Sequence, residues 1–303
     1  MLNICERLWT ELEISEKRCV RSYTSKTNRL TYYYLFVCAF TIFFYAIASL
    51  FISSQNGNEI DSNETIVRNL PYASVIEIHE SPYFEIAYVL QLVSMINVGL
   101  TCVGVDTVGP VLILIACGHL KVIQTKILTL MDDNKLGNDL GQSGEQGLLF
   151  LEDTDTKVAN CVRYHSLILE FCEDIEELAN VIFLTQLIGS TYNISLVGFK
   201  LAGDDPDKYK YTTQVLIAVI QLFLCNWPPD LLVSESTAVA HSMYFMPWYI
   251  YSSQLKKSVY ITIMRSQRAV RLTAGKFVSL SLETFASMIS TAASFFTVIS
   301  SMN

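Results

Sequence analysis

The sequence predicts an all-α membrane protein with about five transmembrane helices, its N-terminus inside and its C-terminus outside. Three observations lead to this prediction. Of the 303 residues, 51% are hydrophobic and only 17% are charged, and the mean hydropathy is +0.35. The apolar residues fall into blocks near the roughly 20 residues that a helix needs to cross a ~30 Å hydrocarbon core. Lysine and arginine gather between alternate blocks.

The five predicted spans lie at residues 32–53, 84–117, 166–198, 211–233 and 277–302. The first is uncharged and rich in aromatic residues. The second contains Gly109-Pro110, so we expect it to kink or to continue past the membrane. The third begins with acidic residues and becomes apolar, as expected of a helix that passes from water into lipid. The fourth reaches Trp227-Pro228-Pro229, where two prolines should end or bend a helix.

Asp106 interrupts the second span. A carboxyl group in lipid is costly, so it marks either a functional site or a buried polar contact. We expect a structural partner elsewhere in the helix bundle.

The basic residues predict the orientation, because short cytoplasmic loops hold them in excess. With the N-terminus inside, all of the 21 Lys and Arg fall on the inner side except Arg68, Lys200, Lys208 and Lys210. Asn63-Glu64-Thr65 is an N-glycosylation sequon in a loop that this orientation places outside. Asn63 is therefore the predicted glycosylation site.

Several classes of function are excluded. A net charge of −8 offers no basic surface for nucleic acid. The eight cysteines form no CxxC pair or Cys/His cluster, and no nucleophile, base and metal ligands stand together. We expect no catalytic residue, no metal and no cofactor. The start of the chain has no apolar stretch typical of a cleaved signal peptide, so insertion is expected to use an internal segment.

The C-terminal part carries a series of motifs. In order they are Ser234-Glu235-Ser236, Tyr244 before Trp248-Tyr249, Met264-Arg265-Ser266-Gln267-Arg268, Leu272-Thr273-Ala274-Gly275-Lys276 and Ser281-Leu282-Glu283-Thr284-Phe285. In this order and spacing the chain resembles the insect odorant receptor family, and weaker resemblance extends upstream through Tyr164-His165 and Ser81-Pro82-Tyr83. Trp227-Pro228-Pro229 departs from the family, in which a small residue is common.

The resemblance implies a fold and a division of the chain. Family members have seven spans, and the five found here match the third to the seventh, so the first two are expected to be missing. The implied parts are a cytoplasmic segment (1–30), a helix bundle (31–233) with outer loops (54–83, 199–210) and an inner loop (118–165), an intracellular anchor (234–276) and a pore-lining helix (277–303).

The resemblance also implies a subunit of an odorant-gated, non-selective cation channel. Its partners would be a small volatile odorant and the family's co-receptor, in a heterotetramer in the plasma membrane of olfactory neuron dendrites. Matching the C-termini places Val298 at a hydrophobic gate, with Ser294 and Ser301 lining the pore. Ser and Thr are also common where membrane helices pack closely, and this alternative stays open for Ser294.

Six residues are expected to line the odorant pocket, because the family binds odorants between the outer halves of several spans. They are Phe44, Tyr45, Tyr88, Met95, Tyr211 and Gln214. The alternative is that these aromatic residues face lipid or form an interfacial belt. At the level of function, a fragment of a G-protein-coupled receptor or a gustatory-type chemoreceptor remains the second interpretation.

Overall fold

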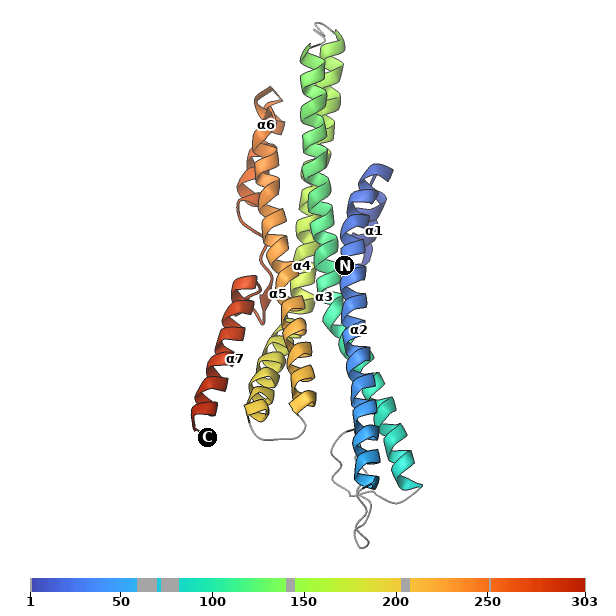
Figure 1. The fold of residues 1–303 in the computed structure, drawn as a ribbon. Coiled ribbons are helices and arrows are strands. Elements are labelled where there is room, and N and C mark those ends of the chain that lie inside the picture. Colours follow the sequence, from blue (N-terminus) through green and yellow to red (C-terminus); the bar gives the residue numbers. More distant parts are fainter. Residues whose placement is uncertain are drawn as a thin grey trace.

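The computed structural model describes residues 2–58, 70–71, 82–139, 145–202, 208–250 and 252–302. Apart from one short hairpin and the short connections between elements, these residues are helical (Figure 1). The elements are α1 (Leu2–Thr10), α2 (Ile14–Asn58), α3 (Tyr83–Asp139), α4 (Glu145–Ala202), α5 (Lys208–Phe245), the 3-10 helix η1 (Trp248–Ile250), α6 (Ser253–Ser266), β1 (Thr273–Ala274), β2 (Val278–Ser279) and α7 (Leu282–Met302).

The helices α2 to α5 are each long and apolar enough to cross a membrane. They contain the first four predicted spans, and the fifth corresponds to the 21-residue helix α7. Helices α3 and α5 each pack against the other three long helices, and α3 makes its largest contacts with α2 and α5. Helix α7 stands to one side, against α4 and α5 (Figure 1).

The fourth predicted span does not end at its two prolines. Helix α5 continues through Pro228 and Pro229 to Phe245. Proline inside a helix costs about 3 kcal/mol because it removes a hydrogen bond and crowds the preceding turn. Pro228 and Pro229 are themselves buried, as are Cys225 and Asn226 in the turn before them, so packing on the neighbouring helices offsets that cost.

Helix α3 likewise continues through Gly109-Pro110. A Cβ atom at Gly109 would lie 2.6 Å from Cζ of Phe183 on α4. The glycine thus allows α3 and α4 to approach closely. Of the two alternatives predicted, a kink or a longer helix, α3 shows the longer helix, because it runs to Asp139.

The segment expected as an inner loop, 118–165, is largely helical. Helix α3 extends to Asp139 and α4 begins at Glu145. The two helices project together beyond the rest of the molecule (Figure 1). Buried apolar residues on their facing surfaces, among them Ile123, Ile127 and Val158, explain why this segment is helical.

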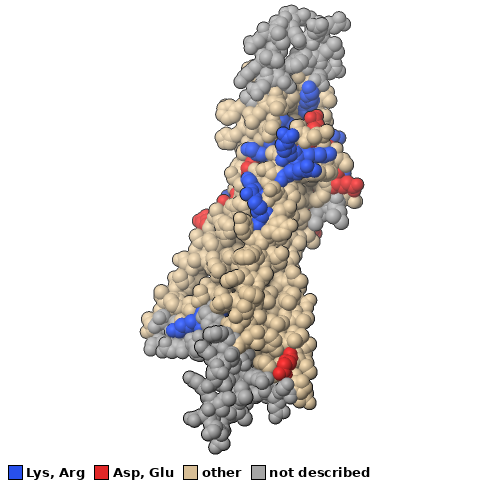
Figure 2. Space-filling model, turned by 45° about the vertical axis from the view of Figure 1, so that its right-hand side comes forward, with Lys and Arg blue, Asp and Glu red and all other residues tan. Residues whose placement is uncertain are grey.

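Charge is unevenly distributed along the length of the bundle. Figure 2 shows a cluster of Lys and Arg on the half of the molecule toward the projecting ends of α3 and α4, next to a wide uncharged belt. Exposed apolar side chains such as Phe36, Phe40 and Leu90 lie on the spans. The uncharged belt is suited to the hydrocarbon core of a membrane. The neighbouring basic cluster is suited to the membrane interface on one side of it.

Candidate functional site

Helix α7 has two different faces. The residues Phe285, Met288, Ile289 and Ala292 face the bundle and pack on its core or are buried. At 100° per residue, a second set of side chains falls on the opposite face, and it comprises Ser287, Ser290, Thr291, Ser294, Val298 and Ser301, all exposed. Val298 is 56% exposed. The structure therefore places the three predicted pore residues on one uncovered face.

The hydroxyl groups of this face donate to the backbone of their own helix. Thr291 Oγ1 donates to the Ser287 carbonyl at 2.8 Å, Ser294 Oγ to that of Ser290 at 2.9 Å, and Ser301 Oγ to that of Val298 at 2.7 Å. A hydroxyl that donates in this way keeps its oxygen lone pairs as acceptors. The exposed face of α7 thus presents oxygen atoms and one aliphatic side chain.

The base of α7 is joined to the bundle by the β1–β2 hairpin. Helix α7 begins at Leu282 rather than at residue 277, because residues 278–279 pair with β1 and the Ser281 hydroxyl accepts from the Thr284 N–H at 3.1 Å. Asn226 Oδ1 on α5 accepts from the Ser281 N–H at 3.3 Å. The predicted pore helix is therefore shorter at its start than the sequence indicated.

Helix α4 holds the hairpin from the other side. Glu176 accepts from the Thr273 N–H at 2.8 Å through Oε2 and from the Thr273 hydroxyl through Oε1. The Gly275 N–H donates to the Asn180 carbonyl at 2.9 Å. Gly275 has φ +60°, and a Cβ there would lie 2.5 Å from Leu184 Cδ2. The motif at 272–276 thus needs its glycine for both conformation and space.

The Ser-Glu-Ser motif joins further segments. Glu235 Oε1 accepts from the Tyr23 hydroxyl on α2 at 2.9 Å, and Oε2 accepts from Gln124 Nε2 on α3 at 2.9 Å. The Ser236 hydroxyl accepts from the Val270 N–H at 3.1 Å. One motif on α5 therefore binds two helices and the chain that follows α6.

Asp106 lies at the junction of four helices and is 2% exposed. Its carboxyl group accepts from the Tyr34 hydroxyl on α2 at 2.5 Å and from Gln186 Nε2 on α4 at 2.7 Å. Gln221 Nε2 on α5 lies 2.9 Å from both carboxyl oxygens. The expected structural partner within the bundle is confirmed, and there are three of them.

The six predicted odorant residues lie in pairs on α2, α3 and α5. The Tyr45 hydroxyl donates to the Lys210 carbonyl at 2.9 Å, and that of Tyr88 donates to the Ala46 carbonyl at 3.0 Å. Tyr45 and Met95 are buried, and Phe44, Tyr88, Tyr211 and Gln214 are partly exposed. Contacts thus link Tyr45 to the start of α5 and Tyr88 to α2. Asn63 lies outside the described residues.

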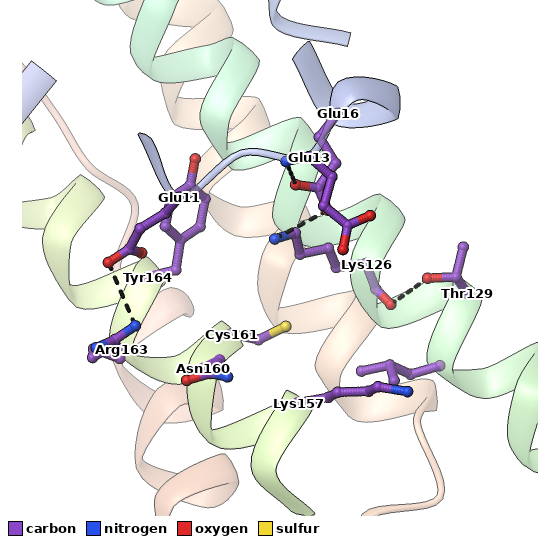
Figure 3. A pocket seen from close by; sticks show the side chains of 11 residues that line it. Glu11, Glu13, Glu16, Lys126, Thr129, Lys157, Asn160, Cys161, Arg163 and Tyr164 are labelled. Carbon is purple, nitrogen blue, oxygen red and sulfur yellow. Dashed lines mark hydrogen bonds and ion pairs between the residues drawn. The ribbon is translucent and has the colours of Figure 1, made fainter. Parts of the chain in front are cut away.

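A cavity of about 420 Å³ lies at the other end of the bundle, between α2, α3, α4 and the connection from α1 to α2 (Figure 3). Glu16 and Lys126 form an ion pair across it at 3.0 Å, and Arg163 and Glu11 form another at 3.4 Å. The cavity contains none of the six predicted odorant residues. Its charged lining suits a seam that joins the N-terminal helices to α3 and α4 better than a site for apolar volatile molecules.

Sequence reasoning missed the side chains that hold the hairpin and Asp106. Glu176 is one of several acidic residues at the start of the third predicted span and was given no separate role, and Asn226, Gln186 and Gln221 carried no signal. Such amides are ordinary in sequence, and their role follows from the helix that they face.

Long apolar helices around a buried polar cluster, with a C-terminal helix docked at the side, define a multi-pass helical membrane protein. The chain belongs to the 7tm Odorant receptor family, whose model matches residues 4–293.

Individual relatives agree with this assignment. The chain is 26% identical to Odorant receptor 13a of Drosophila melanogaster over 72% of this chain and 53% of that protein. It is 26% identical to the Odorant receptor coreceptor of Aedes albopictus over 56% of this chain and 36% of that protein. The chain spans about half the length of the curated relatives it matches.

Solved structures support the fold. The olfactory receptor OR5 of Machilis hrabei, solved in complex with eugenol, aligns with a TM-score of 0.71 at 16% sequence identity, over 99% of this chain and 75% of that one. The resemblance to the insect odorant receptor fold that the motifs predicted is confirmed.

Proposed function

We propose that this chain is an odorant receptor subunit of a ligand-gated, non-selective cation channel, with α7 lining the pore. The observation that carries the proposal is the uncovered face of α7, which aligns Ser294, Val298 and Ser301 opposite the face that packs on α4 and α5. A helix that lines a pore needs such a face, because the residues that face the pore cannot be the ones that pack the helix against its own subunit.

Val298 is the proposed gate. A ring of aliphatic side chains, one from each subunit, closes a narrow pore by excluding water, and a small lateral shift re-wets it. The hydroxyl oxygens on the same face support selection for cations. Their protons are engaged within the helix, so the oxygen lone pairs are what a passing ion meets.

The intracellular anchor is proposed to hold subunits together. The end of α5, η1 and α6 expose large apolar side chains, including Tyr244, Phe245, Tyr249, Tyr260 and Ile261. Aromatic residues are enriched where proteins meet. The proposed partner in a heterotetramer is a co-receptor subunit. The chain is itself similar to one such protein, the Odorant receptor coreceptor of Aedes albopictus.

The proposed ligand is a small volatile molecule bound among the outer parts of α2, α3 and α5. Phe44, Tyr45, Tyr88, Met95, Tyr211 and Gln214 supply aromatic and aliphatic surface with few polar groups, as sites for such molecules require. Eugenol, the molecule bound by the Machilis hrabei relative, is a suitable first member of a test panel.

In this proposal the basic end of the bundle faces the cytoplasm of an olfactory neuron dendrite. The charge distribution in Figure 2 supports that orientation, because basic residues are retained inside. The N-terminus is then inside and the C-terminus outside.

The test is co-expression with a co-receptor in a cell without other odorant receptors. Val298→Glu should raise the resting cation current several-fold, because a charged ring keeps the constriction wet. Val298→Ile is the matched control and should keep the resting current low. Co-purification of the two subunits is measured for each variant, so that loss of assembly is separated from a change in gating.

If Val298→Glu assembles normally but leaves the resting current and the ion selectivity unchanged, the pore assignment is wrong. If odorants from the panel evoke no current while assembly is normal, the ligand-gated function of this chain fails and the structural roles remain.

A further inference from the structure

A small cavity opens where α2 and α5 emerge from the apolar belt. It has a volume of about 230 Å³ and is lined by Lys26, Arg29, Leu30, Tyr33 and Trp227. The first four residues span two turns of α2, and Trp227 comes from α5. Two cations, a phenol and an indole therefore line one shallow, open space.

In the part of the chain that the structure describes, the cations of this cavity have no carboxylate partner. Among the described residues, neither Lys26 nor Arg29 forms an ion pair, although Glu16 and Glu11 on the same end of the molecule are paired with Lys126 and Arg163. The Lys26 ammonium lies 4.7 Å from the centre of the Tyr23 ring, which holds it beside the cavity. The cavity is thus positively charged and open to an anion.

The indole wall is held in place by a stack of rings. The Trp227 ring lies parallel to Phe223, with centres 6.0 Å apart, and Phe223 meets Phe285 at the base of α7 edge-to-face at 5.8 Å. Trp227 is also part of Trp227-Pro228-Pro229, where this chain departs from the resemblance to its family. The Trp227 wall is therefore linked through Phe223 to the start of α7.

The cavity lies at the edge of the hydrocarbon belt on both helices. Arg29 is the last charged residue of α2, which is uncharged from Leu30 to its end at Asn58, and α5 is uncharged from Tyr211 to Pro229. The exposed face of α2 continues from Tyr33 through Phe36 and Phe40. Tryptophan and tyrosine are enriched at this depth, where headgroups meet acyl chains.

We propose that this cavity binds the phosphate group of an anionic membrane phospholipid. Lys26 and Arg29 hold the phosphate oxygens, the Tyr33 hydroxyl and the Trp227 indole N–H are donors at the rim, and the acyl chains follow the exposed apolar face of α2. A lipid fits better than free phosphate because apolar surface continues directly from the cationic groups into the belt. The bound lipid would join α2 to α5 at the point where the ring stack reaches α7.

The experiment measures lipids bound to the full chain, purified in detergent, by native mass spectrometry. Dioleoyl phosphatidic acid is titrated against dioleoyl phosphatidylcholine, which has the same acyl chains and a zwitterionic headgroup, and against inorganic phosphate. The proposal expects tight binding of phosphatidic acid and weak binding of the other two. Each basic residue near an anionic membrane surface contributes about 1 kcal/mol, so Arg29→Gln should weaken phosphatidic acid binding roughly fivefold.

Arg18→Gln is the matched control. Arg18 is exposed on the same helix but lies about 16 Å away along its axis, beyond the ~8 Å screening length at physiological salt. Binding should change less than twofold. Trp227→Ala should weaken phosphatidic acid binding and Trp227→Phe should restore part of it, with elution from a sizing column as the check that each variant is folded.

Three outcomes would overturn the proposal. The first is equal affinity for phosphatidic acid and phosphatidylcholine. The second is equal affinity for phosphatidic acid and inorganic phosphate, which would make the cavity a site for a free anion. The third is an equal loss of phosphatidic acid affinity in Arg18→Gln and Arg29→Gln, which would show that binding depends on the overall positive charge of this end of the molecule and not on the cavity. The measurement uses neither odorant nor current, so it is independent of the proposed channel function.

Discussion

Asp106 illustrates which part of a buried site can be found from single residues. A carboxyl group within an apolar run is unusual, so the sequence predicted that Asp106 has a partner in the bundle. The partners were not predictable, because Tyr34, Gln186 and Gln221 lie on three other helices and none of them is unusual where it stands. Their convergence depends on how each helix is rotated about its axis.

Replacement of Asp106 should destabilise the bundle. Asp106→Ala leaves the donors of Tyr34, Gln186 and Gln221 without an acceptor in a buried site. With a mean of about 0.6 kcal/mol for each hydrogen bond between membrane helices, the free energy of unfolding should fall by about 2 kcal/mol. The stability of Asp106→Asn should lie between that of the unchanged chain and that of Asp106→Ala, because the amide offers one acceptor oxygen in place of two. Thermal unfolding in detergent measures the order.

Asn97→Ala is the control for this series. Asn97 is on the same helix, is exposed and donates only to the Val93 carbonyl of its own helix at 2.8 Å. Its replacement should leave the unfolding temperature nearly unchanged. A fall equal to that of Asp106→Ala would contradict the role given to the four-helix junction.

Gly275 should not accept a side chain. At φ +60° an alanine costs about 1–2 kcal/mol, and its Cβ would meet Leu184 Cδ2 at 2.5 Å. Gly275→Ala should lower the unfolding temperature, and Leu184→Ala in the same chain should relieve the contact but not the backbone strain. Gly189→Ala, on α4 with no atom within 4 Å of the added Cβ, should be neutral or stabilising by up to about 1 kcal/mol. An equal change of unfolding temperature in Gly275→Ala and Gly189→Ala would refute the need for glycine at position 275.

At the scale of elements, the predicted spans all appear as helices, but their ends differ from prediction. Composition indicates where lipid surrounds a helix and says little about where the helix stops in water, so α3 and α4 continue far into the segment predicted as an inner loop. Pro228 and Pro229 were expected to end or bend α5, and the helix runs through them because its neighbours bury it. The prediction began the last helix at the apolar Phe277. The helix starts later, because the Ser281 hydroxyl caps its first turn by accepting a hydrogen bond from the Thr284 N–H.

The contact between α4 and the β1–β2 hairpin should depend on Glu176. Glu176→Ala removes the acceptor of the Thr273 N–H and hydroxyl, and hydrogen bonds to a charged group contribute about 1.5–3 kcal/mol. Amide exchange in residues 272–280 should accelerate roughly tenfold, while exchange in the body of α4 stays slow. Hydrogen exchange followed by mass spectrometry resolves this segment.

Glu177→Ala is the matched control, because Glu177 neighbours Glu176 on α4 and its side chain is exposed. Both variants change helix propensity in the same direction. The hairpin assignment fails if Glu177→Ala accelerates exchange in residues 272–280 as much as Glu176→Ala does.

At the scale of the whole molecule, the distribution of charge predicts the orientation. If the loop that contains Asn63 is outside, expression in a secretory system adds a glycan, and Asn63→Gln removes its mass on a gel. Asn193→Gln should leave the glycan unchanged, because Asn193 lies within α4, one of the candidate spans. Absence of any glycan, together with surface labelling of an N-terminal tag on intact cells, would reverse the orientation.

The sequence by itself determined that the chain is helical, apolar enough for a membrane and related to odorant receptors. These properties reside in local composition and in the order of short motifs, each readable within a few tens of residues. Only the tertiary structure decided which amides meet Asp106, that Glu176 and Asn226 hold the start of α7, and that Lys26, Arg29 and Trp227 share a cavity. Those contacts join residues far apart in the chain, and they are set by the rotation and depth of whole helices, which packing against neighbours determines.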